Sequence, residues 1–406
     1  MSTCAAAAPL SSALPATFPP KRMWAAAWMV VAVFILSNSA TPLYVHWQRA
    51  MGFSSGTLTV IFAAYIAGLL ATLLVAGQLS DRLGRRPVLL PGLAAAIAAC
   101  VLFAMASTVA ALVLARFLSG VAVGVIVSAG MASVVDLGGP DRRRLAALAA
   151  SVAMVLGAGL GPLLAGSLAQ ALPDPVAPIF TAEFAILATA VLVAATLPLK
   201  RPEAGQVAPR RLRLPGVPAA NRRHLAFGIA VFAPGITATS FVLSLGPSLL
   251  SRLLGITSPL VAGGLACAMF LTATGVQFAT RPLSIRTIFL LGAAATGLAM
   301  ASLATAVATS GPAFLIAAAL LAGAGQGLGQ LGGLSLIGLH VPADRRAEAN
   351  AMLNIGGYIP AGLLPVATGY LIDWVGPAAG ATAFAGILAA AAVAGGLFVA
   401  LQLAGD

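Results

Sequence analysis

Charged side chains are scarce in this sequence. They make up 8% of the 406 residues, whereas hydrophobic residues make up 60% and the mean hydropathy is +1.02. A soluble domain carries about 25% charged residues, so the composition excludes an ordinary water-soluble protein. The net charge is +12, but the basic residues form short clusters between apolar runs. This pattern favours anchoring at one face of a membrane over nucleic acid, and we predict no nucleic-acid partner.

Cysteines are few, and the common catalytic motifs are missing. Cys4, Cys100 and Cys267 are far apart and lack the spacing of a metal or redox site. The glycine-rich run at 323–327 lies inside an apolar stretch, so it is not a dinucleotide-binding turn between a strand and a helix. Without a nucleotide loop, metal cluster or catalytic triad, the sequence predicts no enzyme, no metal and no cofactor, and excludes an ATP-driven pump.

Apolar runs of about 20 residues are abundant, and each is long enough to cross the roughly 30 Å hydrocarbon core of a membrane. Counting them predicts an all-α membrane protein with twelve transmembrane helices and both termini on one side. The predicted spans are 24–45, 57–78, 87–108, 110–136, 146–170, 177–198, 225–248, 258–279, 287–308, 312–339, 350–372 and 378–402.

The positions of the basic residues indicate the orientation. With the N-terminus inside, 19 of the 22 basic residues lie in inner segments, Arg49 and Arg252 lie outside, and Arg116 lies within a span. Cytoplasmic loops carry such an excess, so we predict a protein of the plasma (inner) membrane with both termini cytoplasmic. Residues 1–23 form the predicted cytoplasmic tail, because their start lacks the basic region of a cleavable signal peptide.

Residues 199–224 divide the chain into two halves. This segment contains four prolines and seven basic residues, so we predict a cytoplasmic linker between six-helix bundles at 24–198 and 225–402. The run at 141–143 recurs 203 residues later at 344–346. The same offset relates two pairs of glycines, Gly120 with Gly323 and Gly124 with Gly327. Two parallel, pseudo-symmetric six-helix repeats are a transporter architecture.

A compact charged motif lies between the second and third spans. Its signature residues are Gly77, Asp81, Arg82, Gly84, Arg85 and Arg86. Glycine lets the chain turn sharply, an acid at the start of the third span would interact favourably with that helix N-terminus, and arginines hold carboxylates or lipid phosphates.

This motif resembles the first signature of the major facilitator superfamily, and the resemblance extends over residues 21–402. It implies that the loop arginines have an acidic partner in Asp136, at the end of span 4. Such a network would close the cytoplasmic side while the cavity faces outward, and would break when the halves rock. The alternatives are a basic turn that serves topology alone and an interfacial acid in solvent.

Span 4 carries Arg116 followed by Gly120 and Gly124, which resembles the span-4 motif of the superfamily. An arginine inside a span is costly, so Arg116 is a functional candidate. The resemblance implies a role in proton coupling. The alternative is snorkelling to the outer interface.

Span 5 carries Gly157, Gly161, Pro162 and Gly166, which resemble the motif of drug:proton antiporters in this superfamily. Small residues at this spacing let helices approach closely, and proline kinks a helix. The resemblance implies a bending interface that limits leak. The alternative is ordinary close packing in a glycine-rich protein.

Acids are nearly absent from the spans. Glu183 in span 6 is the only clearly intramembrane acid, and span 1 has none, although many proton-coupled exporters carry one there. Glu183 is therefore a candidate proton carrier, with a snorkelling or structural role at the bundle periphery as the alternative. The second-half loop, Arg281–Arg286, keeps basic residues but has lost the acid and the glycines.

Uncharged polar and aromatic residues are candidates for the substrate cavity, because the resemblance implies that their spans line or flank a central cleft. They are Asn38, Tyr44, Thr239, Phe241, Gln326, Gln330, Asn354 and Tyr358. Each could instead hydrogen-bond a neighbouring helix. The set favours a neutral or weakly cationic, fairly apolar substrate.

Together these features predict a monomeric secondary transporter, in contact with membrane lipids, that exports small and moderately hydrophobic molecules in exchange for protons. The proton gradient is the predicted driving force. A sugar or metabolite uniporter or symporter is the alternative within transport. A membrane sensor that does not transport is the third hypothesis.

Overall fold

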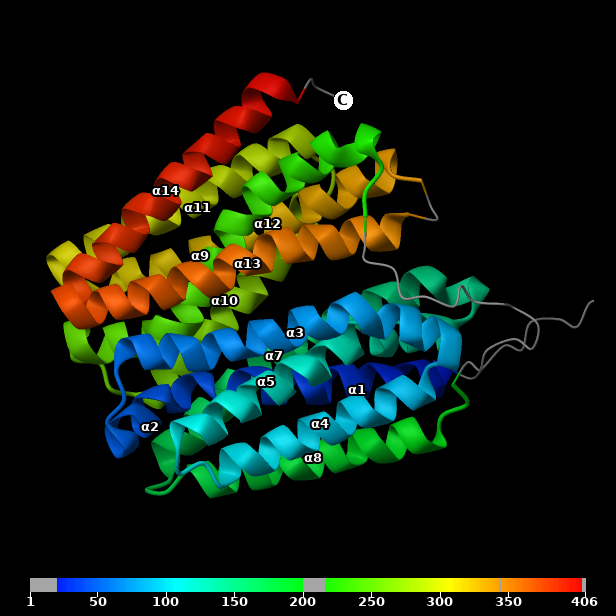
Figure 1. Ribbon diagram of the computed structural model, residues 1–406, viewed down its shortest axis with the longest axis horizontal. Coiled ribbons are helices and arrows are strands. Elements are labelled where there is room, and N and C mark those ends of the chain that lie inside the picture. Colours follow the sequence, from blue (N-terminus) through cyan, green and yellow to red (C-terminus); the bar gives the residue numbers. More distant parts are fainter. Residues whose placement is uncertain (1–19, 200–215, 343–344, 404–406) are drawn as a thin grey trace, which may run out of the picture.

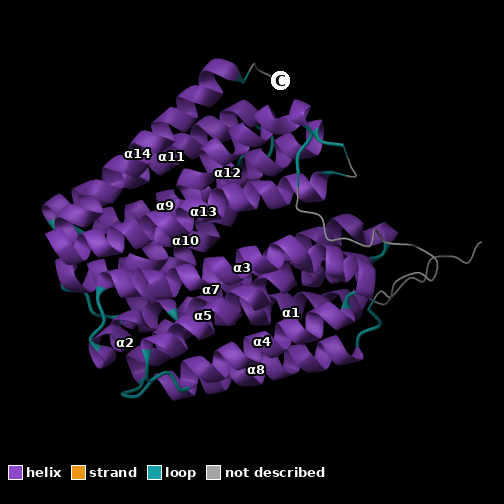
Figure 2. Cartoon of the chain, in the orientation of Figure 1, coloured by secondary structure: helices purple, strands orange, loops and turns teal. Residues whose placement is uncertain are grey.

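The computed structural model describes residues 20–199, 216–342 and 345–403. These ranges form helices joined by short turns and contain no strand (Figures 1 and 2). Twelve segments are long and apolar enough to cross a membrane, which confirms the predicted all-α membrane fold. The predicted tail and linker lie largely outside the described residues.

The first six spans form one half of the molecule. Two of these spans are interrupted, so the half contains eight helices. They are α1 (Pro20–Ser39), α2 (Tyr44–Met51), α3 (Ser55–Leu83), α4 (Arg86–Ala104), α5 (Val109–Val125), α6 (Met131–Gly138), α7 (Arg143–Ala171) and α8 (Val176–Thr196).

The last six spans form the second half, with one helix for each span. They are α9 (Arg222–Leu254), α10 (Pro259–Ala279), α11 (Ile285–Thr309), α12 (Pro312–His340), α13 (Arg346–Val375) and α14 (Pro377–Gln402). Figure 1 shows the two halves lying side by side.

Capping residues fix several of the turns. The side chains of Ser54, Thr108 and Ser258 precede α3, α5 and α10, and each accepts a hydrogen bond from a backbone N–H in the first helical turn. Gly52 and Gly255 end α2 and α9 in the left-handed conformation that glycine adopts without strain.

The predicted repeat is visible in the packing of glycines. Gly120 and Gly124 bring α5 against α3, and Gly323 and Gly327 bring α12 against α10. In each case the glycine faces another helix so closely that a Cβ atom would overlap it. The offset found in the sequence therefore relates equivalent helix–helix contacts, which supports the two pseudo-symmetric bundles.

We call the end of the bundle where α3 meets α4 and α9 begins the basic end, because Arg85, Arg86, Arg222 and Arg223 lie there. The other end, which carries Arg49, is called the opposite end. In Figure 1 the basic end is on the right, and the two halves lie closest on the left and diverge toward the right. The helix pairs α3–α13 and α7–α10 form the main contacts between the halves.

The first span differs from its prediction as one helix over 24–45. The chain is helical from Pro20, so the predicted tail ends before residue 23, and α1 stops at Ser39. A short turn at Thr41–Leu43, which contains Pro42, separates α1 from α2. Proline has no N–H to donate to the preceding turn, so the sequence itself favours a break here.

Candidate functional site

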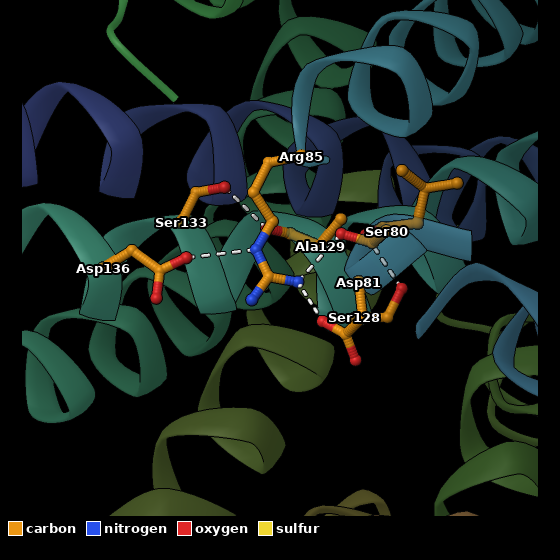
Figure 3. Close-up of polar contacts among 8 residues, drawn as sticks. Ser80, Asp81, Arg85, Ser128, Ala129, Ser133 and Asp136 are labelled. Atoms are coloured by element: carbon orange, nitrogen blue, oxygen red, sulfur yellow. Dashed lines mark hydrogen bonds and ion pairs between the residues drawn. The ribbon is translucent and has the colours of Figure 1, made fainter. Parts of the chain in front are cut away.

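Arg85 links polar side chains at the basic end of the first half (Figure 3). Its Nε donates a hydrogen bond to Asp136 at 3.1 Å, and its Nη1 donates to Asp81 at 2.8 Å and to Ser80 at 2.9 Å. The side chain of Asp136 is 32% exposed, whereas that of Asp81 is 71% exposed. The Arg85–Asp136 bond is therefore the better shielded ion pair. We call Ser80, Asp81, Arg85 and Asp136 the Arg85 clamp.

The clamp connects α3, the start of α4 and α6, which all belong to the first half. The expected pairing of a loop arginine with Asp136 is present, and Arg85 is the arginine that makes it. Because both partners lie in one half, their bond holds the shape of that half and does not itself bridge the two. Its role as a gate stays a prediction.

Asp81 does not lie at the start of the third span, as the sequence analysis expected. The helix α3 continues to Leu83, so Asp81 sits in the last turn of the second span. A carboxylate is unfavourable at a helix C-terminus, and Arg85, four residues further on, supplies the compensating charge. Gly84 makes the turn with φ +89°, whereas Gly77 lies inside α3 and makes none.

Arg86 begins α4 and caps another helix of the same half. Its Nη2 donates to the carbonyl oxygen of Leu197, just after α8, at 2.8 Å. In the second half, Arg286 donates to the carbonyl oxygen of Ala400 in α14 at the same distance. Cations stabilise helix C-termini, so this contact is part of the repeated scaffold, whereas the clamp belongs to the first half.

Arg116 of α5 is buried inside the first half. The residue is 1% exposed, and its Nη1 donates to the carbonyl oxygen of Ser37 in the last turn of α1. Its Cζ lies 5.1 Å from the ring centre of Tyr44 and within 5.8 Å of those of Phe62 and Phe103. The carbonyls at a helix end lack intrahelical partners. Arg116 supplies a hydrogen-bond donor to one such carbonyl, at the break in the first span. The snorkelling alternative is wrong.

Glu183 of α8 lies in the same interior. The residue is 4% exposed, its Oε2 has no hydrogen-bond partner, and Ser39 and Arg116 are close enough to interact with it. It forms no ion pair with Arg116, whose Nε and Nη2 also lack partners. The peripheral snorkelling role is therefore wrong, because the carboxyl group points inward. Glu183 and Arg116 therefore lie close together in the buried interior next to the break in the first span.

The glycines of the span-5 motif pack on both halves. Gly157 and Gly161 face α1 of the same half, and Gly166 faces the start of α10 in the other half. The carbonyl oxygen of Pro162 lies against Gly263 of α10. The motif thus brings α7 close to a helix on each side, which is the geometry that the interface hypothesis requires.

The proposed cavity residues separate into two groups. Asn38, Gln326, Gln330, Asn354 and Tyr358 are half-buried. The Oε1 of Gln326 is buried without a partner, whereas the Nδ2 of Asn38 donates to Ser37 and that of Asn354 donates to a carbonyl of its own helix. Tyr358 lies near Tyr65 of α3, across the boundary between the halves; the sequence analysis did not single out Tyr65.

The other three candidates are buried and make their described contacts within their own half. Tyr44 is fully buried under Arg116. Phe241 stacks on Phe384 of α14 inside the second half, with ring centres 4.0 Å apart. The hydroxyl of Thr239, which is also buried, donates to a carbonyl of its own helix. We therefore no longer assign Tyr44, Phe241 and Thr239 to the substrate cavity.

Asp373, which the sequence analysis did not select, joins the two halves at the opposite end. It lies near the end of α13, and its two carboxylate oxygens accept hydrogen bonds from the backbone N–H groups of Ser55 at 2.9 Å and Gly56 at 2.8 Å, at the start of α3. Gly56 also lies against the ring of Tyr370, and Gly369 against Thr59. We call the contact of Asp373 with Ser55 and Gly56 the Asp373 latch.

Two six-helix halves, packed through α3–α13 and α7–α10 around polar residues of both, define a membrane transporter and not an enzyme. Residues 23–311 match the family model of the Major Facilitator Superfamily, and the chain belongs to that superfamily. No curated protein matches the sequence.

Several solved transporter structures share the fold. A mutant of the nucleoside transporter NupG is 14% identical with a TM-score of 0.71, and the match covers 94% of this chain and 100% of the NupG chain. A bacterial homologue of the human lysosomal transporter Spinster, inward-facing and unoccupied, is 15% identical with a TM-score of 0.67, covering 94% of each chain. A POT family transporter in complex with a thioalcohol-conjugated peptide is 12% identical with a TM-score of 0.73, covering 92% of this chain and 94% of its own.

Proposed function

We propose that the protein is a secondary active transporter that exports small, moderately hydrophobic molecules in exchange for protons. In this proposal it works as a monomer in the plasma membrane with its basic end and both termini in the cytoplasm. The observation that carries the proposal is Glu183, a buried carboxyl group with one unpartnered oxygen beside the equally buried Arg116.

A charged group without a partner is costly inside a membrane protein. Glu183 therefore holds a proton in the present conformation. The two unpartnered nitrogens of Arg116 can stabilise the carboxylate once the helices shift and bring the groups together, and the proton then leaves. The break between α1 and α2, which Arg116 holds through Ser37, is the point where movement of the first span reaches this pair.

Alternating access supplies the movement. The Asp373 latch and the contact of Gly166 with the start of α10 hold the halves together at the opposite end, and in this proposal the basic end is the side that opens to take up substrate. Substrate then binds between the halves, where the buried Oε1 of Gln326 offers a hydrogen-bond acceptor. Rocking would break the contacts at the opposite end and release the substrate there.

The test uses the full-length protein reconstituted in liposomes with an imposed pH gradient and a pH-sensitive dye inside. A transported cation such as ethidium should dissipate the gradient with the wild type and with Glu348→Gln, which removes an acid at the basic end. Glu183→Gln should abolish that proton flux while substrate counterflow persists. If Glu183→Gln retains full proton flux, Glu183 is not the carrier; if no drug-like compound or metabolite alters the gradient, proton antiport is wrong.

A uniporter or symporter for a sugar or other neutral metabolite is the second candidate. The amide side chains of Gln326, Gln330 and Asn354 favour it, because amides both donate and accept hydrogen bonds. Counterflow of a labelled metabolite without any proton movement would support this function. The absence of both counterflow and proton flux would favour a sensor.

A further inference from the structure

A cavity of about 440 Å³ lies between the two halves at the opposite end. The first half contributes residues of α2 and the chain around the end of α7, and the second half contributes residues of α9 and the start of α10. None of the candidate cavity residues discussed above lines it. It is therefore separate from the central polar set, and it has the size of a small-molecule pocket.

The charge of the cavity wall is positive. His46 and Arg49 of α2 line it together with hydroxyl residues, and no Asp or Glu is among the lining residues. Asp174 lies on the turn between the lining residues Pro173 and Pro175, but it is exposed and does not itself line the cavity. The rest of the wall is largely proline and aliphatic, so the cavity offers a cationic side and an apolar body.

Arg49 has hydrogen-bonding capacity to spare. Its Nη2 donates to the hydroxyl of Ser251 across the two halves at 3.2 Å. A guanidinium carries five N–H donors and binds carboxylates in a bidentate manner. The Ser258 hydroxyl, by contrast, already donates to Gln170 and accepts from Val261. The positive end of α10, which starts at the cavity, adds to the preference for an anion.

We propose that this cavity binds a small organic carboxylate with an apolar body, the carboxylate on Arg49 and the body against the proline and aliphatic wall. Because the wall comes from both halves, the complete site exists only while the opposite end is closed. A bound carboxylate therefore stabilises that conformation and slows transport. The inhibitory effect rests on the proposed transport function, whereas binding does not.

The experiment measures binding of phenylbutyrate and of its neutral counterpart phenylbutanol to the purified full-length protein by calorimetry in one detergent. The carboxylate should bind the wild type at least about tenfold more tightly than the alcohol, as expected for one charge-assisted bidentate contact. Arg49→Gln should remove that difference. Arg252→Gln, which removes an exposed arginine of the same end that does not line the cavity, should leave it unchanged.

A second variant separates the anion contact from the link between the halves. Ser251→Ala removes the bond to Arg49 but keeps the guanidinium, so it should bind phenylbutyrate at least as tightly as the wild type. Thr257→Trp, at an exposed lining position, should block both probes by filling the cavity. Equal binding of acid and alcohol, unchanged binding by Arg49→Gln, or equal losses in Ser251→Ala and Arg49→Gln would overturn the proposal. Binding as expected without slower transport would remove only the inhibitory effect.

Discussion

The Asp373 latch gives the sharpest prediction about conformational change. We expect Asp373→Asn to shift the protein away from the conformation closed at the opposite end. The carboxylate accepts two backbone hydrogen bonds at the start of α3, and the side-chain amide of asparagine has only one accepting oxygen and no charge. The substitution therefore leaves one N–H group without its acceptor and removes an anion from a helix N-terminus.

The size of the effect follows from these two losses. A hydrogen bond to a charged group contributes about 1.5–3 kcal/mol, and an anion at an exposed helix N-terminus contributes about 0.3–1 kcal/mol. Because Asp373 is solvent-exposed, screening places the net loss at about 1–2 kcal/mol. The ratio of closed to open protein at that end should then fall by a factor of about five to thirty.

Spin labels can measure this shift. Ser107 and Thr309 are exposed at the opposite end of the first and second halves, and cysteines there, in a background where the native cysteines are replaced by serine, carry the labels. Double electron–electron resonance should show a larger population of long distances in Asp373→Asn than in the parent. Asp174→Asn, which removes another exposed acid at that end, is the matched control. Equal distance distributions in the two variants would refute the latch.

Three further substitutions test other parts of the structure. Asp81→Asn should lower kcat for transport by a factor of about two to five with KM little changed, because its ion pair is exposed; a large rise in KM with unchanged kcat would contradict a role in gating. Gly84→Ala should lower the apparent Tm, because the φ of +89° at this position costs a non-glycine residue about 1–3 kcal/mol. Gly77→Ala, where an added Cβ meets open space inside a helix, should leave the Tm unchanged. Equal Tm values for the two variants would be inconsistent with the turn at Gly84. Gly263→Ala should open the opposite end in the spin-label assay, because its Cβ would overlap the carbonyl oxygen of Pro162. Gly264→Ala, whose Cβ meets no other atom, is the control. Unchanged distances in Gly263→Ala would show that α7 and α10 can move apart without opening that end.

The sequence was sufficient for the number of spans and for the repeat. Long apolar runs leave few ways to place twelve helices, and the offset between Gly120 and Gly323 reflects a contact that both halves need. The partnership of a loop arginine with Asp136 was also expected, because the resemblance of the loop motif to the first signature of the superfamily implies it. The position of Asp81 was not, because nothing in Leu-Ser-Asp-Arg-Leu stops α3 before Gly84.

The directions of side chains were harder to predict. A helix with apolar residues on every side carries no periodic signal that separates the core from the boundary of the halves. Phe241 was therefore predicted to line the cavity although it faces α14. Glu183 could be read as a peripheral acid although it points inward. Asp373 accepts hydrogen bonds from backbone N–H groups 318 and 317 residues away, and backbone donors leave no mark in the sequence.

The contacts between the halves also locate the axis about which the protein would rock. Toward the middle of the helices, Gly159 lies against Cys267 and Gly362 faces Ile66, one contact on each of the two helix pairs. In the proposed alternating-access cycle, a line through these two points would be the axis of rotation. A change there would disturb both end conformations alike, and it would alter the rate of exchange between them more than their relative populations. Contacts far from this axis, such as that of Asp373, would form in only one of the two conformations and would therefore determine which end is open.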